Sequence, residues 1–152
     1  MAGIVVGVDE SENSKAALRW AIDEARLRRV PVVAVHAWDA PIVPPMMDVG
    51  PVPAAPMVDL PEMLQEVKNA AEELLQRVIA EVAGDASGVD VRPLAVEGRP
   101  SSALVEAAQD ADLLVVGSRG LGGFKELVLG SVSHQVASHA PCPVVIHRTS
   151  SS

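Results

Sequence analysis

The sequence predicts an α/β protein with an open parallel β-sheet and helices on both faces. Short runs rich in Val, Ile and Leu alternate along the chain with longer segments whose apolar residues recur at helical spacing. Apolar residues make up 49% of the 152 residues and aromatic residues only 2%, which suits doubly buried strands under Ala-rich helices. Regular alternation indicates parallel strands joined by right-handed crossovers. We expect one domain over 1–148 and a disordered tail over 149–152.

The amino-terminal part of the chain predicts a strand, a helix and a second strand. A continuous β-branched run indicates a strand over 4–8. The following apolar residues repeat at helical spacing over 14–29, and Ser and Asn side chains just before this segment offer N-capping oxygens. Pro31 ends the helix, and the apolar run over 32–37 predicts a second buried strand.

The middle of the chain predicts a long loop, a helix and an edge strand. Seven of the twelve prolines and three methionines fall within 39–61, which has no clear period and is expected to be a loop. The residues over 63–82 carry a regular apolar stripe, so a helix is expected there, ending at Gly84. The segment 89–96 alternates and contains Pro93, which is typical of an edge strand.

The carboxyl-terminal part predicts two further helices and two further strands. Pro100 suits the first position of a short helix, although Arg99 before it offers no capping oxygen. A buried strand is expected over 113–116, a helix ends near Ala140, and the last strand covers 143–147.

A glycine-rich segment lies between the fourth predicted strand and the last helix. Five of the eleven glycines fall within 117–130, and the segment is either a flexible connection or a backbone shaped to hold phosphate. In an open parallel sheet, ligands bind beyond the carboxyl ends of the strands where the crossover direction reverses. Gly117 and Gly120 would let backbone amides approach an anion, and the start of the last helix would present unpaired amides. Arg119 and Lys125 would add positive charge.

The spacing of this segment resembles a known nucleotide-binding pattern. Gly117, Gly120, Gly130 and Ser131 follow the order G-x2-G-x9-G-S, which is similar to the pattern of the ATP-binding universal stress proteins. The opening strand with its Asp9 turn and the segments around the glycines are also similar to that family. The resemblance extends from about residue 2 to 148, apart from the 40–60 loop, and it favours phosphate binding over a flexible connection.

The resemblance implies a Rossmann-like sheet of five parallel strands in the order 3-2-1-4-5. It also implies ATP with Mg²⁺ as ligand, and a homodimer that pairs through the strand over 144–147. The nucleotide-binding residues that it implies are Val8, Asp9, Ala37, Val116, Gly117, Ser118, Arg119, Gly120, Gly130, Ser131, Val132 and Ser133.

The resemblance also implies a role for most of these positions. Asp9 would face the adenosine or a phosphate-bound Mg²⁺, which is the one metal contact expected. Val8 and Ala37 would flank the adenine, and Val116 and Gly117 would lie against the ribose. The phosphates would be held by the backbone amides and hydroxyls of Gly120, Gly130, Ser131, Val132 and Ser133. Glu10 stands where the family commonly has glycine, and an inward carboxylate there would weaken anion binding.

No recognisable catalytic set accompanies this pattern. The candidate bases Asp9, His36, His134 and His139 match no known arrangement. We therefore expect an ATP-dependent regulatory switch in a stress response, with at most weak ATP hydrolysis. The alternatives are a slow ATPase or adenylyl-transfer enzyme, and a nucleotide-free dimeric scaffold.

Composition argues against several other classes of partner. A formal charge of -8 does not suit binding to a nucleic-acid backbone. No apolar run approaches the ~20 residues of a membrane-spanning helix. The start of the sequence does not look like a signal peptide, and the lone Cys142 allows no internal disulfide. We therefore expect no nucleic acid, no membrane and a cytoplasmic location.

Overall fold

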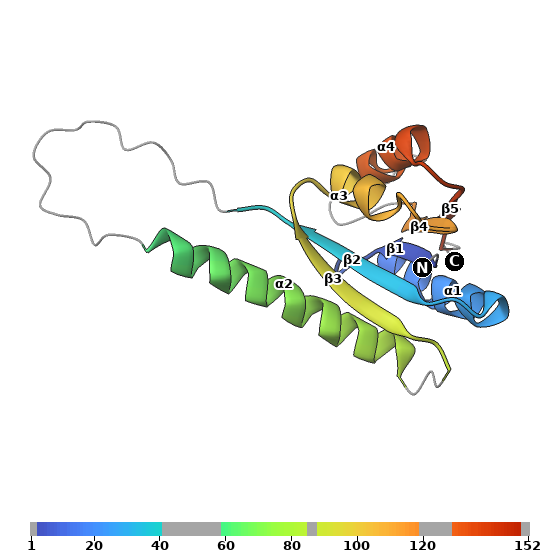
Figure 1. Cartoon of the computed structure of the whole chain (residues 1–152), viewed down its shortest axis with the longest axis horizontal. Coiled ribbons are helices and arrows are strands. Elements are labelled where there is room, and N and C mark those ends of the chain that lie inside the picture. The colour runs from blue at the N-terminus through green and yellow to red at the C-terminus, as the bar shows by residue number, and fades with distance from the viewer. Residues whose placement is uncertain (1–2, 41–58, 85–87, 119–128, 150–152) are drawn as a thin grey trace, which may run out of the picture.

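The computed structural model describes residues 3–40, 59–84, 88–118 and 129–149, and within them five strands form one parallel sheet in the order β3-β2-β1-β4-β5 (Figure 1). The predicted fold class and strand order are therefore confirmed. The strands are β1 (Ile4–Gly7), β2 (Val32–Trp38), β3 (Val91–Glu97), β4 (Leu113–Gly117) and β5 (Val144–His147). The helices are α1 (Glu12–Arg28), α2 (Leu60–Ala83), α3 (Pro100–Ala107) and α4 (Ser131–His139).

The two long helices begin earlier than their apolar patterns predict, because polar side chains cap them. Ser11 precedes α1, and its Oγ accepts a hydrogen bond from Ser14 N at 3.2 Å. Asp59 precedes α2, and its Oδ1 accepts a hydrogen bond from Glu62 N at 3.4 Å. The last two residues of the predicted 39–61 loop therefore belong to α2. The part of the loop over 41–58 lies outside the described residues.

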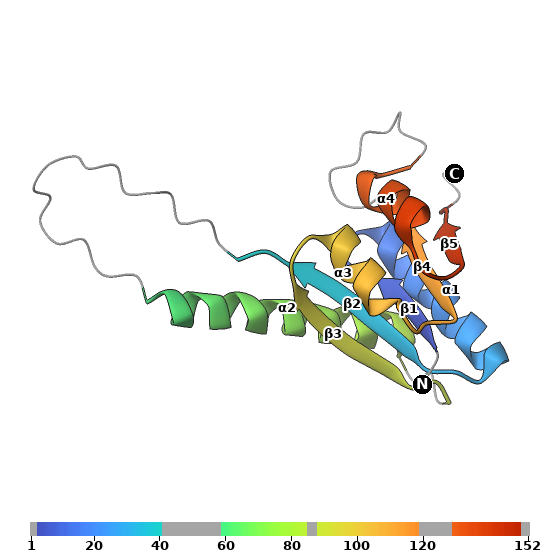
Figure 2. The same cartoon turned by 45° about the horizontal axis from the view of Figure 1, so that its top comes forward.

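Two apolar layers sandwich the sheet. Helices α1 and α2 cover one face, and α3 and α4 cover the other (Figures 1 and 2). Alternation along β1 sends Ile4 and Val6 to the first layer and Val5 to the second. Both layers are filled by aliphatic residues, so the core needs few aromatic side chains. Leu75 and Leu114, for example, are fully buried at 0% exposure.

The strand order places β1 at the centre and β3 and β5 at the edges. Pro93 lies in β3 opposite Ala34, which confirms the predicted edge position of its strand. The chain leaves β1 toward β2 through α1, and later crosses from β3 to β4 through α3 on the opposite face. The crossover direction therefore reverses between β1 and β4, and the carboxyl ends of these two neighbours form the switch point where a ligand is expected.

The end of α1 contains a strained residue that yields a stability prediction. Arg29 caps the helix with φ 60° and ψ 45°, and its N–H donates to Ala25 O. Left-handed conformation costs a side-chain-bearing residue about 1 kcal/mol more than glycine. Arg29→Gly should therefore raise the free energy of unfolding in urea by about 0.5 to 1 kcal/mol. The control Arg28→Gly, in the last helical turn, should lower it by up to about 1 kcal/mol; stabilisation by both or neither would contradict this reading.

Candidate functional site

The end of β2 offers an unpaired stretch of backbone above β1. Strand β1 ends at Gly7, opposite Val35, whereas β2 continues to Trp38. Val35 O accepts from Val8 N at 2.8 Å, and Trp38 O accepts from Gly98 N at 2.9 Å, so Val35 faces β1 and Trp38 faces β3. Because the direction alternates along a strand, the N–H and C=O of Ala37 face the space beyond the end of β1. One backbone donor and one acceptor are thereby directed toward the switch point, where a ligand crevice is expected.

The turn after β1 is held by side chains around Asp9. Asp9 Oδ1 accepts hydrogen bonds from Ser11 N, at 2.7 Å, and from Ser11 Oγ. Ser14 Oγ accepts from Asp9 N at 3.0 Å and lies 2.8 Å from Asp9 O. One carboxylate oxygen therefore stabilises the turn, and the other has no partner among the described residues. The D-x-S-x-x-S spacing could have predicted these hydrogen bonds, although from the sequence we expected Asp9 only to face a ligand or metal and the serines only to cap the helix.

The start of α4 carries amides without intrahelical partners. Its N-cap is Gly130, which has no side chain to accept them, so the N–H groups of Ser131, Val132 and Ser133 have no partner within the part of the chain that the structure describes. Gly130 N donates to Ser118 O at 2.7 Å, which fixes this helix start directly after β4. The positive end of the helix dipole therefore lies at the switch point, where it favours an anion.

Ser133 serves the structure through its hydroxyl group. Its side chain is 3% exposed, and its Oγ lies 3.0 Å from both Ser118 O and Gly130 O. The hydroxyl hydrogen is therefore directed to a protein carbonyl rather than to a ligand. The backbone amide of Ser133 is therefore its candidate phosphate contact.

Close packing against α1 explains why position 117 is a glycine. A Cβ built at this position would lie 3.1 Å from both the carbonyl carbon and the oxygen of Asn13, at the start of α1. These atoms belong to the backbone and have little freedom to move. The glycine therefore allows β4 to end close to α1, and this geometry does not require a ligand against Gly117.

Three other predicted residues lie behind the crevice. Val8 is 5% exposed, its N–H binds Val35 O, and its carbonyl lies 2.8 Å from His36 Nδ1. Val116 is 3% exposed in the layer of α3 and α4, and Ser118 is buried with its N–H donating to His147 O at 2.9 Å. Because these three side chains are buried, they offer little surface for direct contact with a ligand. Arg119 and Gly120 lie outside the described residues.

The charge of Glu10 is compensated. Its carboxylate lies 2.6 Å from Arg77 Nη2 on α2, and both side chains are exposed. A second ion pair, between Lys15 of α1 and Glu81 of α2 at 3.2 Å, joins these two helices, and this contact contributes most to the raised pKa of Lys15. The inward carboxylate that would repel an anion is therefore not observed.

The remaining candidate side chains form no catalytic or metal-binding set within the described ranges. His36 binds the carbonyl of Val8, and His134 and His139 are exposed on α4. Among these residues, no group of three or more His, Cys, Asp or Glu side chains could hold a metal ion. The pKa of the Cys142 thiol is raised by burial and then by the charge of Asp112, which favours the protonated thiol at neutral pH.

The protein is therefore a parallel α/β protein, and its candidate ligand site lies at the switch point between the carboxyl ends of β1 and β4. The family model described as the Universal stress protein family matches residues 2–148, and the chain belongs to this family. A universal stress protein of Mycobacterium tuberculosis is 37% identical over 147 residues, which cover 97% of this chain and 44% of that protein. The chain spans about half the length of the curated relatives it matches.

Two solved structures of the family are similar over nearly the whole chain. A universal stress protein in complex with cAMP has a TM-score of 0.68 and 28% identity, with 98% of each chain covered. A universal stress protein from Archaeoglobus fulgidus in complex with dAMP has a TM-score of 0.63 and 26% identity, with 96% of this chain and 97% of that chain covered. In the ranges described for this chain, no helix is long and apolar enough to cross a membrane.

The hydroxyl anchor of α4 can be tested by comparing two serines of the same helix. Ser133→Ala removes a buried hydrogen bond to the end of β4 and should lower the free energy of unfolding by about 1 to 2 kcal/mol. Ser138 Oγ bonds only its own helix, to His134 O at 3.0 Å, and is exposed, so Ser138→Ala should change stability by less than about 0.5 kcal/mol. Equal urea midpoints for the two variants would remove the anchoring role from Ser133.

Proposed function

We propose that this protein is a nucleotide-dependent regulatory switch of the stress response that binds ATP, with Mg²⁺, in the crevice beyond β1. The observation that carries the proposal is the start of α4, which has a glycine cap and is fastened to the end of β4. Its free amides and helix dipole suit a phosphate chain. The crevice also has a backbone donor and acceptor on its opposite side, at Ala37.

The proposed ligand extends from β2 to α4. The adenine lies by the backbone of Ala37, whose N–H and C=O can pair with the nitrogen edge of the base. The ribose lies above the end of β1, near Asp9 and the end of β4. The phosphates bind the amides of Ser131, Val132 and Ser133 and the exposed hydroxyl of Ser131, and we retain Arg119 and Gly120 as further phosphate contacts.

The comparisons support an adenine nucleotide as the class of ligand. The two structures cited above are complexes with cAMP and with dAMP, and both proteins share this fold. The choice of ATP rests on the spacing of the glycines, which is similar to that of the ATP-binding members of the family. Mg²⁺ would supply charge neutralisation between phosphate oxygens, and Asp9 retains a carboxylate oxygen that fits such a role.

Catalysis is the weaker proposal for this crevice. His134 lies in the first turn of α4, but among the described residues it forms no recognisable catalytic set with a nucleophile or a second base, so we expect at most weak hydrolysis of ATP. Turnover near the ~10 per second of ordinary enzymes would favour the ATPase or adenylyl-transfer alternative. Failure to bind any adenine nucleotide would favour a nucleotide-free scaffold.

We also propose that residues 1–148 form one domain, that the protein is a cytoplasmic homodimer, and that it binds no nucleic acid. The dimer would form through the edge of β5. Leu114 N and Ser118 N bind Pro143 O and His147 O, so the alternate residues Val144 and Ile146 direct their N–H and C=O groups away from β4. These outward groups form an edge that a second copy can pair with.

The phosphate contacts can be tested at Ser131, the first residue of α4. Ser131→Pro removes its N–H and hydroxyl, and proline is tolerated at a first helical position. Gly130, with φ -72° and ψ 169°, already has the extended conformation that precedes proline. In calorimetry with ATP and Mg²⁺, Ser131→Ala should weaken binding about fivefold, and Ser131→Pro about tenfold or more. Unchanged dissociation constants in both folded variants would exclude this helix start as the phosphate site.

The proposed dimer can be tested by removing one outward N–H group of β5. Ile146→Pro deletes a donor at the free edge and leaves the hydrogen bonds between β4 and β5 intact. Sedimentation should show a dimer for the unaltered chain and a monomer for the variant, with unchanged far-ultraviolet circular dichroism. A variant that remains dimeric would place the interface elsewhere.

A further inference from the structure

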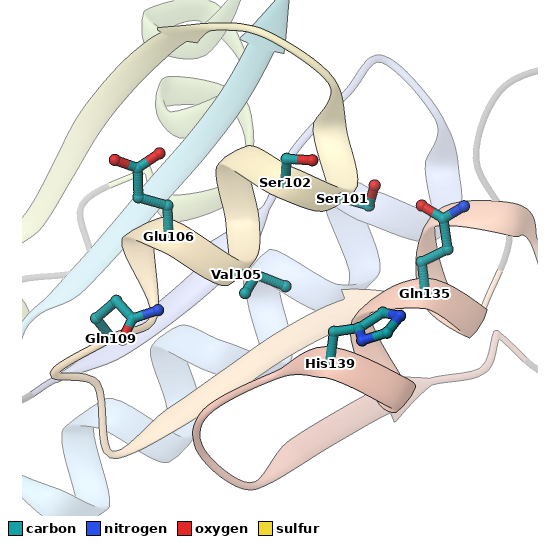
Figure 3. A pocket seen from close by; sticks show the side chains of 7 residues that line it. All are labelled: Ser101, Ser102, Val105, Glu106, Gln109, Gln135 and His139. Atoms are coloured by element: carbon teal, nitrogen blue, oxygen red, sulfur yellow. The ribbon is translucent and has the colours of Figure 1, made fainter.

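A second concave site lies between α3 and α4, apart from the proposed nucleotide crevice. Its volume is about 470 Å³, within the usual range for small-molecule sites. Figure 3 shows its side chains: Ser101, Ser102, Val105, Glu106 and Gln109 from α3 or just beyond its end, and Gln135 and His139 from α4. None of these residues belongs to the set proposed to hold the nucleotide.

The two helices present one face each to this pocket. On the α3 side, Ser101, Val105 and Gln109 recur every four residues, and Gln135 and His139 are one turn apart on α4. Figure 3 places Val105 between the two helices, with Ser101 and Gln135 toward one end of the group and Gln109 toward the other. The pocket therefore combines an apolar centre with a border of hydrogen-bonding groups.

The charges of the pocket favour a cation. Among the described residues that line it, Glu106 carries the only formal charge, and no Lys or Arg is present. Hydroxyl, amide carbonyl, carboxylate and neutral imidazole groups can all accept hydrogen bonds from a ligand. The overall charge of -8 adds a long-range attraction for cations.

The helix dipoles reinforce this preference at one end. Helices α3 and α4 both run from the carboxyl end of one strand to the amino end of the next in a parallel sheet, so they point the same way. His139 is the last residue of α4, and Gln109 follows the end of α3. The partial negative charges of both helix ends therefore fall on the same side of the pocket, and they stabilise a positive group there.

We propose that this pocket binds a small organic amine in its protonated form. The ammonium group lies toward Glu106, Gln109 and His139, where it donates hydrogen bonds to side-chain acceptors. The hydrocarbon part of the ligand covers Val105. This site does not depend on the proposed nucleotide site, because the two share no residue.

The proposal can be tested by nuclear magnetic resonance with putrescine as the probe. The unaltered ¹⁵N-labelled chain is titrated at constant ionic strength, and 1,4-butanediol serves as the uncharged control of the same length. Putrescine should shift the backbone amides of 101–109 and 135–139 in a saturable way, and butanediol should leave them unchanged. Equal shifts with both compounds, or putrescine shifts spread over the acidic surface, would overturn the proposal.

Three exposed substitutions separate a site from general attraction to an acidic protein. Glu106→Gln should weaken putrescine binding about three- to fivefold, as expected for loss of an exposed ion pair. His139→Lys should abolish it, because a fixed positive charge then occupies the ammonium end. The control Glu66→Gln removes a carboxylate that is also exposed, on α2, and should leave the affinity unchanged. An equal effect of Glu106→Gln and Glu66→Gln, or full binding by His139→Lys, would contradict the assignment.

Discussion

Parallel pairing around the buried central strand β1 is the constraint on which the rest of the structure depends. Because β1 pairs on both sides and is covered on both faces, its end at Gly7 can only be followed by a tight turn into α1. Strand β2 continues past that end to Trp38, whereas β4 ends at Gly117. The crevice is therefore the space left above a strand that stops early, bounded by backbone groups whose direction is set by the register.

At the carboxyl ends of β1 and β4, some polar groups hold the backbone in place and others are left to contact a ligand. Ser14, Ser133 and His36 all direct side-chain atoms to protein backbone groups, and they hold the turn after β1 and the start of α4 in place. Within the described ranges, the groups left available are mainly backbone amides, at Ala37 and at the start of α4, together with one carboxylate oxygen of Asp9 and the hydroxyl of Ser131. A site built from backbone is positioned by the fold itself, which suits a binding protein better than an enzyme that needs an acid or base.

The central strands β1, β2 and β4 could be predicted because they are short, apolar and largely buried, and Pro93 correctly indicated that β3 is an edge strand. Helix starts were less predictable, since Asp59 caps α2 within a proline-rich segment whose composition indicated only a loop. The glycine spacing indicated the carboxyl end of β4 as a candidate ligand site, but the structural role of each residue there required tertiary contacts. Gly117 meets Asn13, and Ser133 meets Ser118, through packing that no local pattern contains. The orientation of Ala37 likewise follows from strand register alone.

The most direct test of the account is a ¹⁵N spectrum of the unaltered chain titrated with ATP and Mg²⁺. We expect saturable shifts of the backbone amides of Ser131, Val132 and Ser133, together with that of Ala37, because the phosphates and the base would meet these groups at opposite sides of one crevice. Saturable binding that moves other amides and leaves these four unchanged would contradict the proposed site, and no shifts at millimolar ATP would contradict nucleotide binding itself.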